Sequence, residues 1–367
     1  MILLNPGPVT LSERVRQALL RPDLCHREPE FTALQQSICT RLLGVYGLPP
    51  DHWAAVLLTG SGTAAVEAMM STLIKDTGSV LILENGVYGE RLTAIARIHG
   101  LHHVRLHHAW DRGIDLDAVR ACLDQNRRFH YVALVHHETT TGRLNPIAEL
   151  AEICAARGVG LLVDGVSSFG AEHLDFMRWN IAACAATANK CLHGVPGVAF
   201  VVVQRQALPP AGQAARSLYL DLRQYCEAQD AGSTPYTQSV QGFYALDEAL
   251  SELEEEGGWS ARQRRYREHL THIREGLAAV GIRPLLPAAA CSVVLNSFHL
   301  PEGMEYLTLH DQLKQHGFVI YAGQAAFAKV LFRVSTMGAI SADDVQRFIA
   351  AIGDICLKCE SPNADPV

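Results

Sequence analysis

Short, uninterrupted apolar runs alternate with helical patterns through the first two-thirds of the chain. The runs include AAVLLTG, SVLILE, YVALV, VGLLVD and GVAFVVV, and most are separated by stretches with the 3.6-residue apolar period of a helix. A strand with one face in water alternates apolar and polar residues, whereas a strand covered on both faces is apolar throughout. The alternation therefore predicts an α/β protein whose mainly parallel sheet carries helices on both faces.

The pattern changes after about residue 245, where a long charged helix, SARQRRYREHLTHIREGLAAV, leads into shorter strands and helices. The 367 residues are enough for two domains with separate cores. We predict a large domain over residues 16–250 and a smaller α+β domain over residues 251–367, which ends in a frayed tail, SPNADPV. The N-terminal segment, residues 1–15, is expected to pack against the small domain.

Charge and composition exclude several classes of protein. A formal net charge of −7 gives no electrostatic reason to expect a nucleic-acid partner. The opening residues, MILLNPGPVT, hold too short an apolar run for a signal peptide, and no segment is long and uncharged enough to span a membrane. The ten cysteines show no disulfide framework, and the lone CxxC pair of Cys356 and Cys359 is weak support for a metal or redox site. We therefore expect a cytoplasmic protein with reduced thiols and no metal site.

A glycine-rich loop, LLTGSGTAAVEA, joins a predicted strand to a predicted helix. The free N–H groups and the positive dipole end of such a helix bind phosphate well, so Ser61, Gly62 and Thr63 are candidate phosphate ligands. The same loop matches the dinucleotide pattern G-x-G-x-x-G/A, and Glu84 ends the next strand near the place of a ribose-binding acid. An NAD(P)-dependent oxidoreductase is therefore one alternative, and a tight turn without a ligand is another.

A lysine and an aspartate stand at two further strand ends. Lys190, one of only five lysines, lies among small residues in ATANKCLHGVPGVAFVVV, and Asp164 ends the apolar run VGLLVD. The plain interpretations are a lysine that keeps its head in water and an aspartate that caps a turn. However, pyridoxal phosphate requires a lysine for its Schiff base, a carboxylate at its ring nitrogen and a phosphate cradle. Lys190, Asp164 and the glycine-rich loop supply all three, whereas a dehydrogenase gives Asp164 and Lys190 no role.

Over nearly its whole length the chain resembles the class V, fold type I aminotransferases, which depend on pyridoxal 5′-phosphate. The resemblance is carried by NPGPVT, TGSGTAAVEA, NGVYGERL, VHHETTTGRLNPI, VDGVSSFG, ANKCLHGVPGVAFVV and FVIYAG…FRVSTMG. Among these, HHETTTG, SSFG and ANKCLHGVPG are most similar to the 2-aminoethylphosphonate:pyruvate aminotransferase branch. The resemblance implies transfer of an amino group between 2-aminoethylphosphonate and pyruvate, in either direction, by a homodimer with a shared active site. An alanine- or serine:glyoxylate-type aminotransferase is the alternative within the class.

The resemblance also implies roles for individual residues. Lys190 would form the Schiff base and then act as general base and acid, and Asp164 would hold the proton of the pyridinium nitrogen. Arg333 in LFRVS would bind the anionic group of the substrate, since a planar guanidinium suits a carboxylate or a phosphonate. Further cofactor contacts are implied for Ser61, Gly62, Thr63 and Asn189 at the phosphate, Tyr88 stacked on the ring, Thr139 near the ring's 3′ oxygen, and Thr237, which the other subunit would donate to the phosphate.

Three segments depart from the family pattern, and all three surround the substrate rather than the cofactor. The chain has FRVSTMG where the family often has FRIGNIG, TPYTQ where it has sequences like TPPTH, and an unusual CHREPEF near residue 25. These departures leave the exact amino donor and the direction of the reaction open. Arg27 is a candidate second anion contact, with a surface salt bridge as the plainer interpretation. His136 and His137 precede the cofactor loop and are assigned no chemistry.

Overall fold

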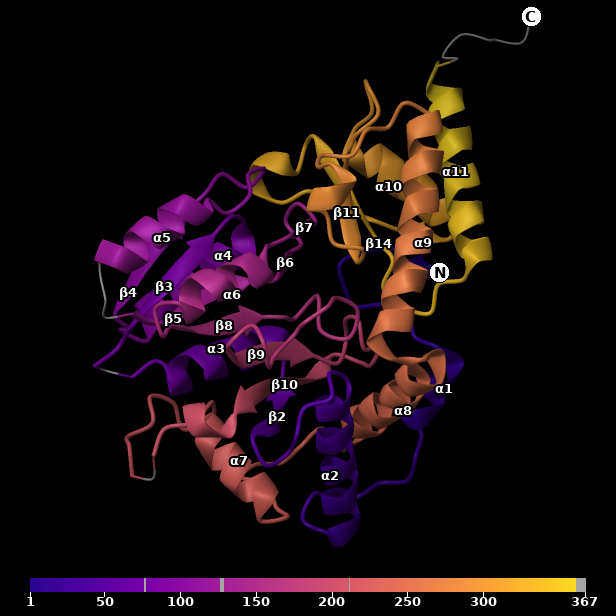
Figure 1. The fold of residues 1–367 in the computed structure, drawn as a ribbon. Helices are drawn as coiled ribbons and strands as arrows, with labels where there is room; N and C mark the ends of the chain where they lie inside the picture. The colour runs from indigo at the N-terminus through magenta and orange to yellow at the C-terminus, as the bar shows by residue number, and fades with distance from the viewer. Residues whose placement is uncertain (76, 126–128, 211, 361–367) are drawn as a thin grey trace, which may run out of the picture.

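A computed structural model describes residues 1–75, 77–125, 129–210 and 212–360, with side chains as far as residue 357. The predicted frayed tail lies outside the described residues, as does the side chain of Cys359 in the CxxC pair. The chain forms two parts, one built on a large sheet and a smaller one beside it (Figure 1). Among the described helices, none combines the length and the apolar character that crossing a bilayer requires.

The larger part is organised around a seven-stranded sheet with the strand order β2-β10-β9-β8-β5-β3-β4. All neighbouring strands run parallel except β10, which is antiparallel to both β2 and β9. The strands are β2 (Trp53–Gly60), β3 (Ser79–Glu84), β4 (His103–His107), β5 (Phe129–Val135), β8 (Gly160–Asp164), β9 (Ile181–Thr187) and β10 (Gly197–Gln204). The predicted mainly parallel sheet is therefore confirmed.

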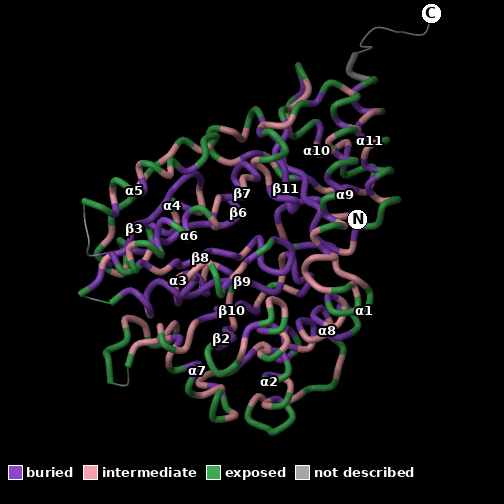
Figure 2. Tube along the Cα trace, viewed as in Figure 1, coloured by how far each residue is buried: buried purple, intermediate pink, exposed green. Residues whose placement is uncertain are grey.

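Successive side chains of a strand point to opposite faces of the sheet, and here both faces are apolar. Helices cover both of them. In β2, Leu57 packs into the apolar cluster on one face and Val56 into the cluster on the other. The strands lie at the buried centre of the larger part in Figure 2. One face is covered by α2 (Pro29–Gly44), α5 (Leu116–Gln125), α6 (Ile147–Ala155) and α8 (Val240–Glu256), and the other by α3 (Gly62–Leu73), α4 (Val87–Ile98) and α7 (Leu222–Asp230).

The smaller part is a three-stranded antiparallel sheet packed against three helices, with an apolar cluster of its own. Its elements are β11 (Leu295–His299), β13 (Tyr321–Ala322), β14 (Leu331–Ser335), α9 (Gly258–Ala279), α10 (Tyr306–Gln315) and α11 (Ala342–Glu360). Side chains of α8 belong to the core of the large sheet, whereas side chains of α9 belong to the small core. The domain boundary near residue 250 stays a proposal, which this division of the cores supports.

The N-terminal segment reaches the smaller part of the molecule. β1 (Ile2–Leu3) pairs in parallel with β12 (Phe318–Val319), and Leu4 packs into the small core. The chain then crosses back to the larger part through the short helix α1 (Glu13–Ala18). The remaining short elements are α1 (Glu13–Ala18), β6 (His137–Glu138), β7 (Arg143–Leu144), η1 (Arg205–Ala207), η2 (Ala288–Ala290) and η3 (Ala325–Phe327).

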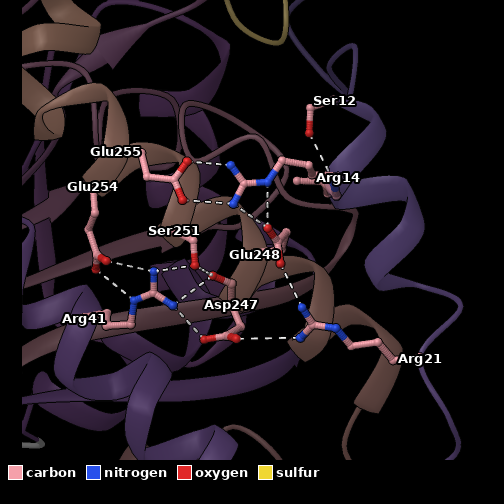
Figure 3. A network of polar contacts seen from close by, with 10 residues as sticks. Ser12, Arg14, Arg21, Arg41, Asp247, Glu248, Ser251, Glu254 and Glu255 are labelled. Carbon is pink, nitrogen blue, oxygen red and sulfur yellow. Dashed lines mark hydrogen bonds and ion pairs between the residues drawn. The ribbon is translucent and has the colours of Figure 1, made fainter.

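Ion pairs fasten α1 and α2 to α8 (Figure 3). Nη1 of Arg41, on α2, lies 2.8 Å from Asp247 Oδ1, and its Nε lies 2.8 Å from Glu254 Oε1. Arg14 and Arg21 both point toward Glu248 of the same helix, with N···O distances of 2.9 and 2.8 Å. Because α8 itself packs on the sheet, these contacts hold the N-terminal helices against the larger part.

Candidate active site

A cavity of about 490 Å³ opens at the edge of the large sheet where β2, β5, β8 and β9 end. Carboxyl ends of parallel strands meet at one edge, so polar residues that follow different strands come together there. The antiparallel β10 begins at this edge, and the first turns of α3 and α4 complete the wall. Larger hollows of about 610 and 810 Å³ lie elsewhere, but their described linings include none of the predicted cofactor ligands. The smaller cavity is therefore the candidate active site.

Lys190 is half-buried in the wall of this cavity. The pKa of Lys190 is lowered from an ordinary 10.5 to about 8, mainly by burial and also by the positive charges of Arg333 and Arg91, whereas Cys191 and Asp164 oppose the change. Its Nζ donates a hydrogen bond to the carbonyl oxygen of Pro6. The next residue is Gly7, with a φ of +115°, where an added Cβ would collide with Nζ. The N-terminal segment thus comes close to the amine, and a side chain at position 7 would be strained by this φ and would push Lys190 aside.

Asp164 ends β8 and is buried at the floor of the site. The N–H of Val166 donates to its Oδ1 at 3.0 Å. Burial raises the pKa of the carboxyl from 3.8 to about 6, and the charges of Arg91 and Lys190 act in the opposite direction. At neutral pH the group is therefore an ionised carboxylate held in a cavity with two cations, Arg91 and Lys190.

The glycine-rich loop begins α3, and its residues 60–63 line the cavity. Ser61 is the N-cap residue, but its side chain makes no capping hydrogen bond. The first N–H groups of a helix lack intrahelical partners, so this turn presents free donors to the cavity. An added Cβ at Gly62 would lie 2.8 Å from Val166 Cγ1, so a side chain there would have to displace Val166. The loop is suited to holding an anion.

The structure brings most of the other predicted residues to the same wall. Tyr88, Thr139 and Asn189 all line the cavity. Arg333 lies behind it on β14, buried, where its Nη1 donates to the carbonyl oxygen of Thr139 at 3.1 Å and its Nε to that of Ala322 at 2.9 Å. Arg333 is therefore one residue removed from the cavity surface, on the side of the smaller part.

Two predicted residues lie apart from the cavity. Thr237, in the loop before α8, is exposed and is not among the described lining residues. Arg27 is also exposed, and its Nη1 lies 3.5 Å from the carbonyl oxygen of Thr234. No carboxylate of the described residues pairs with Arg27, so the expected salt bridge is absent from the described part of the chain.

Two polar residues of the cavity wall had been given no role: Arg91 was not predicted to belong to the site, and His137 was named without a chemical function. His137 places its Nδ1 3.0 Å from the carbonyl oxygen of Ser167, so Nδ1 carries the proton, and the buried Nε2 has no partner among the described residues. Burial lowers its pKa to about 4, which keeps the imidazole neutral. Position was the available signal: Arg91 follows Tyr88 by three residues, and residues three apart share a face of a helix.

A carboxylate from outside the helix fixes the first turn of α4. Glu138 accepts hydrogen bonds from the N–H of Gly89 at 3.1 Å and from the hydroxyl of Thr140 at 2.6 Å. The Thr140 hydroxyl oxygen in turn accepts from the N–H of Val87 at 3.0 Å. At Gly86 an added Cβ would collide with the Glu138 carboxyl group. Residues 138–140 therefore cap α4 and hold the helix at the edge of the cavity.

The strand order contradicts the dinucleotide-binding alternative. In that motif the strands on either side of the glycine-rich loop and its helix belong to one compact βαβ unit. Here β2 is an edge strand and β3 lies beside the opposite edge, with four strands between them. Glu84 at the end of β3 is buried and hydrogen-bonded by Thr93 of α4, far along the sheet from the loop.

Comparisons with known proteins agree with the geometry of the cavity. The family model for class V aminotransferases matches residues 50–348. A 2-aminoethylphosphonate–pyruvate transaminase of Burkholderia pseudomallei is 38% identical over 96% of this chain and 95% of its own length. The protein of the same name in Pseudomonas putida is 36% identical over 98% of both chains.

Among solved structures, an alanine–glyoxylate aminotransferase from Nostoc sp. superposes with a TM-score of 0.90 at 26% identity, covering 96% of this chain and 94% of that one. Its fold supports the predicted fold type I architecture, which is confirmed. The match of the family model over most of the chain, together with relatives more than 30% identical over nearly its full length, shows that the chain belongs to the class V aminotransferase family.

Proposed function

We propose that the protein transfers an amino group between 2-aminoethylphosphonate and pyruvate with pyridoxal 5′-phosphate as its cofactor. The products would be phosphonoacetaldehyde and L-alanine, or the reaction would run in reverse. The observation that carries the proposal is the meeting of Lys190, Asp164 and the loop of residues 61–63 in one cavity. The choice of substrate is supported by the relatives from Burkholderia pseudomallei and Pseudomonas putida, whose names give this reaction.

The described residues fit pyridoxal phosphate in charge and in hydrogen-bonding capacity. The first turn of α3 offers donors to a phosphate, Asp164 a carboxylate to a ring nitrogen, and Lys190 an amine to an aldehyde. The buried, unpartnered Nε2 of His137 marks a polar position in the wall that a bound group can satisfy. When bound, the cofactor supplies an aldehyde that takes up the amino group and a ring that accepts electrons.

Lys190 and Asp164 divide the handling of protons. A pKa of about 8 lets Nζ of Lys190 both accept and release a proton near neutral pH, as a general base and acid must. Asp164, with a pKa of about 6, is ionised at neutral pH and holds a proton at a neighbouring nitrogen through charge attraction. Burial strengthens the attraction of Asp164 for that proton, because little water is present to screen the charge.

Arg333 suits the anionic end of both substrates. Each substrate, the aminoalkylphosphonate and the 2-oxo acid, carries one anionic group, and a guanidinium binds carboxylate and phosphonate oxygens in the same forked geometry. Two of its donors already hold the carbonyl oxygens of Thr139 and Ala322, which orients the remaining N–H groups. A single arginine can therefore serve both half-reactions.

The proposal includes a homodimer in the cytoplasm. Thr237 is exposed and lies outside the cavity of its own chain, as expected of a residue that serves a partner's site. Each active site would then receive this hydroxyl from the other subunit, at the cofactor phosphate.

A half-reaction tests the proposed substrate. The cofactor-loaded enzyme is mixed separately with 2-aminoethylphosphonate, L-alanine and L-serine, without an acceptor, and the visible absorbance of the bound cofactor is followed. We expect rapid loss of the band with 2-aminoethylphosphonate and L-alanine, and slow loss with L-serine. Rapid conversion by L-serine with little by the phosphonate would instead indicate the glyoxylate-dependent function of the Nostoc relative.

Lys190→Ala is the control for the chemistry. It should abolish conversion of every donor, because no other described lysine lines the cavity. Normal turnover by this variant would refute the role of Lys190, and a wild-type protein with no visible band would refute the choice of cofactor.

A further inference from the structure

Arg91 is an arginine of the cavity wall to which the proposed chemistry gives no task. It lies on α4, and its Nη1 donates to Thr63 Oγ1 at 3.0 Å, directly beside the loop that begins α3. Its guanidinium carbon lies 4.7 Å from the centre of the Tyr88 ring, so the aromatic ring covers one face of the cation. These contacts hold the side chain toward the cavity.

The charge of Arg91 is not balanced by an acid of its own. Other arginines of the larger part, such as Arg41, pair with carboxylates, whereas among the described residues no carboxylate lies within ion-pair distance of Arg91. Within the described lining, Arg91 and Lys190 are cationic and Asp164 is the one carboxylate. The cavity therefore has an excess of positive charge, and an anionic ligand would neutralise it.

The hydrogen bond to Thr63 also has a direction that favours an anion. Thr63 Oγ1 accepts from Arg91, which leaves the hydroxyl hydrogen available as a donor. Of the five N–H donors of the guanidinium, only one is used in this bond. Thr63, Arg91 and the free N–H groups of the α3 turn are thus donors gathered at one place. The cap made by Glu138 and Thr140 fixes the helix that carries Arg91.

We propose that Arg91 binds a tetrahedral phosphorus oxyanion in this cavity, an inference that rests on the proposed function. Two groups of that function share this chemistry: the phosphate of the cofactor and the phosphonate of the amino donor. The short distance to the 61–63 loop favours the cofactor phosphate. A charge-assisted bidentate contact would contribute affinity that a neutral side chain of similar length cannot replace.

The test compares Arg91→Gln with wild-type protein by titrating the cofactor-free, full-length chain with pyridoxal phosphate and with pyridoxal, which lacks the phosphate. We expect Arg91→Gln to weaken the binding of pyridoxal phosphate about 10- to 100-fold, as for loss of a charged hydrogen bond, and to leave the binding of pyridoxal unchanged. Arg91→Lys should restore part of the loss. Arg97→Gln, an exposed arginine on the same helix, is the matched control and should change neither constant.

The other outcomes separate the two sources of the anion from a structural role. If both cofactor constants stay unchanged but the half-reaction with 2-aminoethylphosphonate saturates at a much higher concentration, with L-alanine unaffected, the ligand is the substrate phosphonate. Equal weakening of pyridoxal phosphate and pyridoxal, or no change in any of these quantities, would overturn the proposal and leave Arg91 as a support for Tyr88. A wild-type chain that bound neither compound would instead refute the proposed function, and the inference with it.

Discussion

Lys190→Met should stabilise the cofactor-free protein, because the folded chain holds a charged amine in a poorly solvated place. The drop of the Lys190 pKa from 10.5 to about 8 corresponds to about 3 kcal/mol, at about 1.4 kcal/mol for each pKa unit. Methionine has a similar length and no charge, so it removes this cost. It also removes the hydrogen bond from Nζ to the carbonyl oxygen of Pro6, which stabilises the wild type by about 1–2 kcal/mol. We expect a net stabilisation of about 1–2 kcal/mol at pH 7.

The pH dependence of the free energy of unfolding gives a sharper test, since its sign follows from the lowered pKa of Lys190. Between pH 8 and 10.5 the folded wild type has released the Lys190 proton while the unfolded chain still holds it. The free energy of unfolding of the wild type therefore rises with pH in this range, and that of the methionine variant lacks this contribution. The advantage of the variant should shrink by about 2 kcal/mol between pH 7.5 and 9.5.

Urea denaturation of the cofactor-free proteins at one fixed protein concentration measures both quantities. Lys314→Met, at an exposed lysine of α10, is the matched control and should change stability by less than about 0.5 kcal/mol at either pH. A Lys190→Met variant less stable than wild type at pH 7, with a difference that does not vary with pH, would show that the amine is not held at a lowered pKa.

Gly62→Ala should weaken cofactor binding by about tenfold or more, because its Cβ would lie 2.8 Å from the Val166 side chain; Gly44→Ala, with open space around it, is the control in the same titration. Glu138→Ala should lower the free energy of unfolding by about 2–4 kcal/mol, since it removes the acceptor of the Gly89 N–H in α4 and of the Thr140 hydroxyl. Urea denaturation beside the exposed-site variant Glu149→Ala checks this, and equal stabilities would show that residues 138–140 do not fix the helix. Arg41→Ala should lower the free energy of unfolding by about 1–2 kcal/mol, measured by thermal or urea denaturation. If ion pairing accounts for most of this loss, it should be smaller in 1 M salt.

The arrangement of the site was predictable for those functional residues that stand at the ends of predicted strands. Asp164 and the 61–63 loop stand at the ends of two predicted strands, and strands that run in parallel end at one edge, so their meeting follows from the sequence pattern. Lys190 was predicted only to precede the run GVAFVVV, and its place at the same edge depends on the unpredicted strand β9. Arg91 and Glu138 were not predictable in this way. Their roles depend on where α4 packs against the 138–140 segment, and that packing leaves no periodic signal in the sequence.

Strand β9 shows the limit of reading strands from apolar runs. Its sequence, IAACAAT, is rich in alanine, which is disfavoured in strands, yet every residue is buried at the centre of the sheet. Small side chains suit this place because the start of α3 packs closely on it, with a Cβ at Gly62 only 3.4 Å from Thr187. Once β9 is known, the antiparallel direction of β10 follows: residues 188–196 are too few for a parallel crossover of about a dozen residues or more.

The N-terminal segment links β14, the strand that carries Arg333, with the amine of Lys190. The carbonyl oxygen of Leu4 accepts from the N–H of Ser335, two residues beyond Arg333 on β14, and two residues further along the segment the carbonyl oxygen of Pro6 accepts from Lys190. Three residues, Leu4 to Pro6, therefore reach from β14 of the smaller part to the amine of the larger part. The first residues of the protein thus fasten the strand that carries Arg333 and the amine of Lys190 to one short segment, which joins the two parts of the molecule beside the cavity.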